Sequence, residues 1–131
     1  MGIELFFASL AIILILDFIW ISIIMKRFYN KELLNIARKE KGKLKPNLIS
    51  GLIVYLIIAF GITLFVIPIS NTILESLIYG ALFGLVLYGV YDLTNFSTLK
   101  DFSLKMTLVD LTWGTFLCGI TSLLIRMILI K

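Results

Sequence analysis

The sequence predicts an all-α, polytopic membrane protein: a four-transmembrane-helix bundle with a short basic amphipathic segment in the first loop. Three observations indicate this fold class. The 131 residues are 60% hydrophobic and 15% charged, whereas a soluble domain is about 45–50% apolar and about 25% charged. The apolar residues gather into four stretches, each near the roughly 20 residues that cross a bilayer. None of them shows the period-two alternation of membrane β-strands.

The four stretches follow one another with short loops between them. No linker or low-complexity segment interrupts the chain, so residues 1–131 are expected to form a single four-helix transmembrane domain. Pro68 falls near the end of the second stretch, where a missing backbone hydrogen bond costs little. The predicted spans are residues 3–25, 48–70, 74–97 and 106–130.

Positive charge is concentrated in the first loop, where residues 26–47 hold eight basic and two acidic residues. Cytoplasmic loops of membrane proteins carry such an excess of Lys and Arg. The rule places loops 26–47 and 98–105 in the cytoplasm and both termini outside. Arg126 and Lys131 run against this trend, and we expect both side chains to extend to the outer interface.

The first loop also contains apolar residues among its charges. We expect a basic amphipathic helix that begins after Asn30 as N-cap, stops at Gly42, and lies on anionic lipid head groups along residues 26–45. The alternative is a charged connector that only sets topology. A basic protein can also bind nucleic acid, but the loop distribution already explains the charge, so the lipid bilayer is the predicted partner and nucleic acid is not.

Three aspartates fall within or beside spans, all in the predicted cytoplasmic half: Asp17, Asp92 and Asp110. An aspartate at the centre of a membrane helix costs about 2.5–3.5 kcal/mol on insertion scales, and less towards the interface. We therefore expect the three side chains to face the bundle interior and to share partners or water.

The third span places its polar residues at one end of a single face. At 100° per residue, six residues fall within an arc of about 120°. The small end, Gly80-x-x-x-Gly84, permits close helix contact, and the other end is polar. The six residues are Gly80, Gly84, Tyr88, Tyr91, Asp92 and Asn95.

Each of the other two aspartates has a tryptophan three residues later, Trp20 after Asp17 and Trp113 after Asp110. This spacing puts carboxylate and indole on the same helix face. Taken alone, Trp20 fits an interfacial aromatic belt and Asp110 fits the first turn of a helix. Taken together, the residues predict a ligand-binding site of carboxylates and indoles. Its candidate residues are Asp17, Trp20, Tyr91, Asp92, Asn95, Asp110 and Trp113; Tyr55 could line it or only pack.

One stretch resembles a known family. Tyr91-Asp-Leu-Thr-Asn, followed by Thr98-Leu99, and then Asp110-x-x-Trp113-Gly114 are similar to bacterial four-span predicted membrane proteins catalogued as a domain of unknown function, as is Leu16-Asp17-x-x-Trp20. Ser97, Phe102 and Ser103 depart from the family pattern. The resemblance covers the whole chain and implies a cytoplasmic-membrane protein with four helices, and no settled activity.

Three functions remain open. The first is transport or binding of a cationic or polar small molecule, with a homodimer needed to enclose a route. The second is a structural or accessory subunit whose polar residues only join helices. The third is a membrane enzyme acting on lipid or prenyl substrates, which the absence of histidine and of Asp-x-x-Asp spacing disfavours. With one cysteine and no histidine, no metal, cofactor or catalytic residue is predicted.

Overall fold

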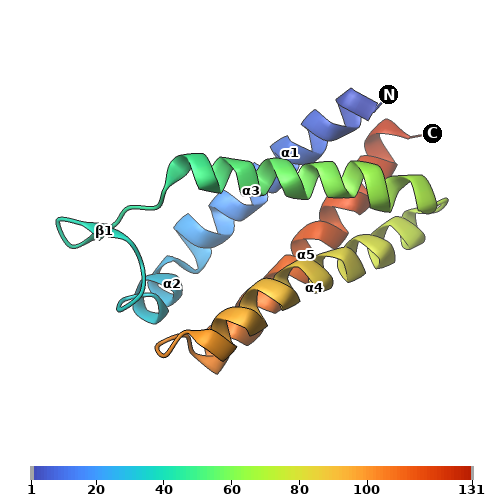
Figure 1. Cartoon of the computed structure of the whole chain (residues 1–131). Helices are drawn as coiled ribbons and strands as arrows, with labels where there is room; N and C mark the ends of the chain where they lie inside the picture. Colours follow the sequence, from blue (N-terminus) through green and yellow to red (C-terminus); the bar gives the residue numbers. More distant parts are fainter. Residues whose placement is uncertain (1, 131) are drawn as a thin grey trace.

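The computed structural model describes residues 2–130, which form four helices long and apolar enough to cross a membrane (Figure 1). Every helix end lies within two residues of the predicted span, so the all-α four-span fold is confirmed; Lys131 lies outside the described residues. The spans are α1 (Gly2–Ile19) with the π-helical η1 (Trp20–Ile24); α3 (Leu48–Gly61) with η2 (Ile62–Val66) and η3 (Ile67–Ile69); α4 (Ile73–Thr98); and α5 (Leu104–Leu129).

Polar caps define where three of the spans begin. The side chains of Asn47, Thr72 and Ser103 each accept a hydrogen bond from a backbone N–H three residues later, at 2.9–3.1 Å. The first N–H groups of a helix have no partner within the helix, and such caps satisfy one of them. These three residues therefore fix the register at which α3, α4 and α5 begin.

A seam of small residues brings α4 against α5, which run side by side in Figure 1. A Cβ on Gly80 would come within 2.6 Å of the Cys118 carbonyl oxygen, and one on Gly84 within 2.9 Å of the Cys118 Cβ. A Cβ on Gly114 would collide with the Tyr88 ring. The glycine contact predicted for the third span is thus present, and it sets how closely the two helices approach.

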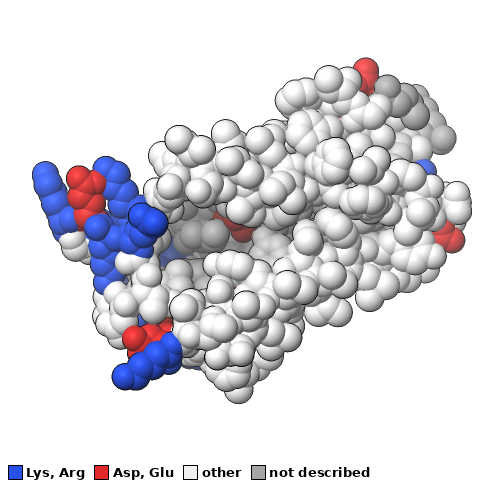
Figure 2. Space-filling model, viewed as in Figure 1, with Lys and Arg blue, Asp and Glu red and all other residues white. Residues whose placement is uncertain are grey.

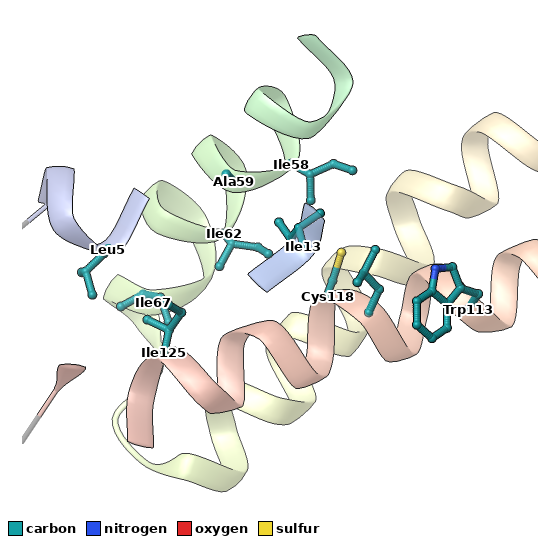
Figure 3. Close-up of a cluster of buried hydrophobic side chains, with 10 residues drawn as sticks. Leu5, Ile13, Ile58, Ala59, Ile62, Ile67, Trp113, Cys118 and Ile125 are labelled. Carbon is teal, nitrogen blue, oxygen red and sulfur yellow. The ribbon is translucent and has the colours of Figure 1, made fainter. Parts of the chain in front are cut away.

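The apolar core lies where α1, α3 and α5 meet, as Figure 3 shows for Ile13, Ile62 and Cys118. All three side chains are fully buried. Most other large apolar side chains are exposed, which suits helices whose outer faces meet lipid. The core extends along the bundle from Leu5 and Ile125 to Trp113.

The first loop differs from its prediction. A helix is present, but α2 spans only Lys26–Glu32, and Asn30 lies within it instead of capping it. Gly42 (φ 78°) and Lys41 (φ 53°) form the turn of a hairpin between β1 (Lys39–Glu40) and β2 (Lys43–Leu44). Positive φ at both central residues is what a type I′ turn requires. The expected helix up to Gly42 is therefore wrong.

Arg126 also departs from its prediction, because its side chain turns inward instead of extending to the interface. Its guanidinium donates to the carbonyl oxygens of Ile67 (3.0 Å) and Ser70, to the Ser70 hydroxyl at 3.2 Å, and to the Ser76 hydroxyl at 3.1 Å. The Ile67 carbonyl already accepts from the Ser70 N–H and hydroxyl, whereas the Ser70 carbonyl, just past the end of η3, has no helical partner. Arg126 supplies one from α5 and so ties the α3–α4 turn to the last span.

Candidate functional site

Asp17 is the first centre of a buried polar cluster at the end of the bundle that carries the basic loop. It lies two residues before the end of α1 and is 4% exposed. The Trp113 indole N–H donates to its Oδ1 at 2.8 Å, and the Tyr55 hydroxyl donates to its Oδ2. Both carboxylate oxygens thus have donors, from α5 and from α3, and Asp17 joins three spans.

The two tryptophans stack on each other, and neither indole bonds the aspartate that lies three residues before it in the sequence. Their rings lie 4.3 Å apart and are inclined by only 3°. Trp113 bonds Asp17 on another helix, while the Trp20 indole N–H donates to the Tyr29 hydroxyl at 2.9 Å. Tyr29 in turn donates to Asp110 Oδ1 at 2.9 Å. The pairing therefore crosses between helices instead of following the i, i+3 spacing along each one.

A local distortion of the first span accompanies the position of Trp20. The residue begins the π-helical turn η1, closed by the Met25 N–H bonded to the Trp20 carbonyl at 2.8 Å. Such turns hold one more residue than an α-helical turn and are frequent at functional sites. The next segment, α2, then carries Tyr29 back under the bundle, where it packs against Phe102 and Met106.

Asp92 is the exceptional member of the cluster. Its side chain is 0% exposed, and neither carboxyl oxygen has a hydrogen-bond partner within residues 2–130. The carboxyl group of Asp110 lies beside it, close enough for the two to share a hydrogen bond when one of them holds a proton. A buried polar group without a partner is uncommon and costly, so this pair of carboxyl groups needs a shared proton or a positive charge.

Two predicted site residues do not join the cluster. Tyr91 is 60% exposed, because the helix turns its side chain outward next to the buried Asp92. Asn95 is partly exposed and makes no side-chain hydrogen bond to any of the three aspartates. The polar face of α4 is thus narrower than the 120° arc suggested, and only Asp92 of these three enters the interior.

Two residues of the cluster were absent from the predicted set. Tyr55 was expected either to line the site or to pack, and its hydroxyl bonds Asp17. Tyr29 lies in the loop, and nothing in the local sequence indicated that α2 folds back onto α5. A tyrosine one residue after Phe28 in a charged loop was the only signal, since buried tyrosines usually find a hydrogen-bond partner.

Comparison with known proteins assigns the chain to a family. A family model described as Predicted membrane protein (DUF2177) matches residues 2–126. The chain belongs to this family. Its function is unknown, and the match includes all residues of the cluster. No curated protein and no solved structure matches the chain.

In this DUF2177 protein the cluster is divided into two parts. Asp17 with its two donors forms one part, and Asp110 with Tyr29 and Asp92 forms the other. The stacked tryptophan rings connect the two parts. Burial, and then the charge of Asp110, raise the pKa of Tyr29, so its hydroxyl keeps its proton and donates to that carboxylate. Within residues 2–130 no three acidic, Cys or His side chains converge to hold a metal ion. The arrangement suits a single positive charge beside Asp92.

Proposed function

We propose that this integral membrane protein binds a small cationic molecule at the Asp92–Asp110 pair and carries it across the bilayer. The observation that carries this proposal is Asp92: it is fully buried, no N–H or hydroxyl group of residues 2–130 donates to its oxygens, and a second carboxyl group lies beside it. Asp17 and Asp110 each have a donor, so a ligand is not needed to satisfy them.

Electrostatics favours a cationic ligand. An ionised carboxylate away from water is very costly unless an opposite charge is near, and a neighbouring carboxyl group adds repulsion. A bound cation removes both costs at once. Ionisable residues within spans are in general associated with substrate and ion pathways, which fits a carrier better than a rigid scaffold.

The stacked indoles give the pocket an aromatic wall. Trp20 and Trp113 cover one face of each other, and Phe116 packs near the Trp113 ring, so the outer face of Trp20 is the one left for a ligand. An organic ammonium group is attracted to such a face and to a carboxylate together. The aromatic wall therefore favours an ammonium compound over a hydrated metal ion. Figure 2 shows acidic atoms within a hollow between helices.

The orientation completes the proposal. Loops 26–47 and 98–105 face the cytoplasm, with both termini outside, in the cytoplasmic membrane. Figure 2 shows Lys and Arg gathered at this end, and Figure 1 places both termini at the other. The cation site then opens towards the cytoplasm, the loop meets anionic lipid head groups, and a second copy is needed to enclose a route through four-span subunits.

Intrinsic fluorescence tests binding directly, because Trp20 and Trp113 are the only two tryptophans of the chain and both belong to the cluster. Purified protein in detergent is titrated with ammonium, tetramethylammonium, choline, Na⁺ and Mg²⁺. We expect a saturable spectral change with an organic ammonium ion. Asp92→Asn should abolish it, while Asp101→Asn, which removes a carboxylate from the exposed α4–α5 turn, should leave it unchanged.

Transport needs a separate measurement. The cation that binds is offered to proteoliposomes holding wild type, Asp92→Asn or Asp101→Asn. Uptake by wild type and by the control, with none by Asp92→Asn, supports a carrier. Binding without uptake would restrict the function to a binder. No binding of any tested cation, with the protein folded, would contradict the proposal.

A structural role is the second candidate, and the bonding of Asp17 favours it. Trp113 and Tyr55 satisfy this carboxylate from two other helices, which is how polar side chains join helices in membranes. Asp17→Asn keeps the shape and weakens the acceptor. If that variant retains cation binding with lowered stability, Asp17 holds helices together; if it loses binding at unchanged stability, Asp17 belongs to the cation site.

A further inference from the structure

A second pocket lies under the first loop, apart from the acidic cluster. It has a volume of about 550 Å³ and is enclosed by the end of the first span, α2 and the β1–β2 hairpin. Its polar lining comprises Lys26, Lys39 and Lys43 with Ser22 and Asn30. No acidic residue lines it.

The two acidic residues of the loop are engaged elsewhere. Glu40 forms an ion pair with Lys45, and Glu32 accepts a hydrogen bond from the Ser103 hydroxyl at 2.7 Å. The Lys39 ammonium donates to the Leu34 carbonyl oxygen, which holds the hairpin over α2. Lys26 and Lys43 therefore bring positive charge to the pocket with no acidic side chain to balance it.

Depth and apolar lining indicate what fills the pocket. Ile21 and Ser22 are near the last residues of the first span, so the pocket lies where that span leaves the hydrocarbon. Leu34 and Leu44 also line it and are 56% and 43% exposed. Positive and hydroxyl groups beside exposed leucines, at the edge of a bilayer, match an amphiphile with an anionic head and apolar chains.

We propose that this pocket binds the head group of one anionic phospholipid, with its phosphate between Lys26 and Lys43 and its acyl chains along the exposed leucines. The inference rests on the proposed placement of the loop at an anionic membrane surface and adds a defined site to it. A soluble phosphate would gain nothing from the apolar lining, so the source of the anion is the lipid.

The test compares two charge-matched variants. Lys26→Gln/Lys43→Gln removes two charges from the pocket, and Arg27→Gln/Lys31→Gln removes two charges from exposed positions of α2 that do not line it. Each purified protein in detergent is titrated with phosphatidylglycerol, phosphatidylcholine or inorganic phosphate, and bound lipid is counted by native mass spectrometry. The tryptophan spectrum and helical content confirm folding. If the double pocket variant does not fold, the single variants Lys26→Gln and Lys43→Gln replace it.

For wild type we expect tighter binding of phosphatidylglycerol than of phosphatidylcholine. The pocket variant should weaken phosphatidylglycerol about fivefold for each lysine, hence about 25-fold, and the control variant by less than about twofold. Equal losses in both variants would overturn the pocket while leaving the loop at the membrane surface. No loss in either would overturn the pocket and argue against that placement. Displacement of the lipid by equimolar inorganic phosphate would overturn the lipid assignment.

Discussion

The two ends of the bundle each contain buried or half-buried polar groups, but in opposite states of satisfaction. At the end with the α3–α4 turn, Arg126 donates to two carbonyl oxygens and two hydroxyls. At the end with the basic loop, Asp92 is completely buried and has no partner within residues 2–130. Arg126 therefore donates hydrogen bonds to groups at a helix end, whereas no N–H or hydroxyl group of the described residues donates to Asp92.

The comparison distinguishes polar groups that stabilise the fold from a polar group that we assign to function. A satisfied network rigidifies a fold, and removing a member leaves other groups unpaired. An unsatisfied carboxyl group lowers stability, and evolution retains such groups mainly where they serve a function. The comparison therefore predicts opposite signs when each residue is replaced by an apolar one.

Replacing Arg126 should have the largest effect. Arg126→Leu removes the donor to the Ser70 carbonyl and one of the hydrogen bonds made by the Ile67 carbonyl and by the Ser70 and Ser76 hydroxyls. We expect a loss of about 2–3 kcal/mol of unfolding free energy, measured by denaturant titration in mixed micelles. Arg27→Leu, on the exposed part of α2, is the control and should change little. Unchanged stability of Arg126→Leu would show that the inward contacts contribute nothing.

The glycine contact between α4 and α5 tests whether stability and cation binding can be changed separately. In Gly84→Ala the new Cβ meets Gly114 and Cys118, and overpacking of this kind costs about 2 kcal/mol. Gly51→Ala is the control, because nothing lies within 4 Å of its Cβ. Since the seam holds α4 against α5, Gly84→Ala should weaken cation binding too. Intact binding at reduced stability would separate the seam from the site.

Replacing Asp92 should have the opposite sign to Arg126. Asp92→Leu removes an unpartnered buried carboxyl group, and we expect a gain of about 1–2 kcal/mol in unfolding free energy together with loss of cation binding. The same micelle titration measures it, with Asp101→Leu as control. A loss of stability comparable to that of Arg126→Leu would mean that Asp92 has a structural partner, and would remove the basis of the proposed site.

The smallest effect is expected at Tyr29. Tyr29→Phe removes the acceptor of Trp20 and the donor to Asp110, two bonds of about 0.6 kcal/mol each, so about 1 kcal/mol is lost; exposed Tyr91→Phe should lose nothing. Because burial raises the pKa of Tyr29, it stays neutral where an unfolded tyrosine ionises, above pH of about 10. Its contribution is therefore complete below pH 10 and is lost above it. Between pH 9 and 11 the unfolding free energy of Tyr29→Phe should therefore fall less than that of wild type in the same titration.

Local sequence was sufficient for the helices. Apolar length predicts a span regardless of its neighbours, since every backbone group is satisfied within the helix, and each predicted end was within two residues. The predicted loop helix was wrong because Lys41 and Gly42 adopt positive φ angles and form a type I′ turn. The charged composition of that segment suits a helix and a hairpin equally well.

The sequence by itself determined four spans, a basic loop, and three aspartates at one end, because hydrophobicity and charge act residue by residue against the bilayer. Only the tertiary structure decided the partners. Which indole meets which carboxylate depends on the rotation and approach of separate helices, and so Trp113 bonds Asp17 while Trp20 reaches Asp110 through Tyr29. In that arrangement no N–H or hydroxyl group of residues 2–130 donates to Asp92, which no spacing along the chain could reveal.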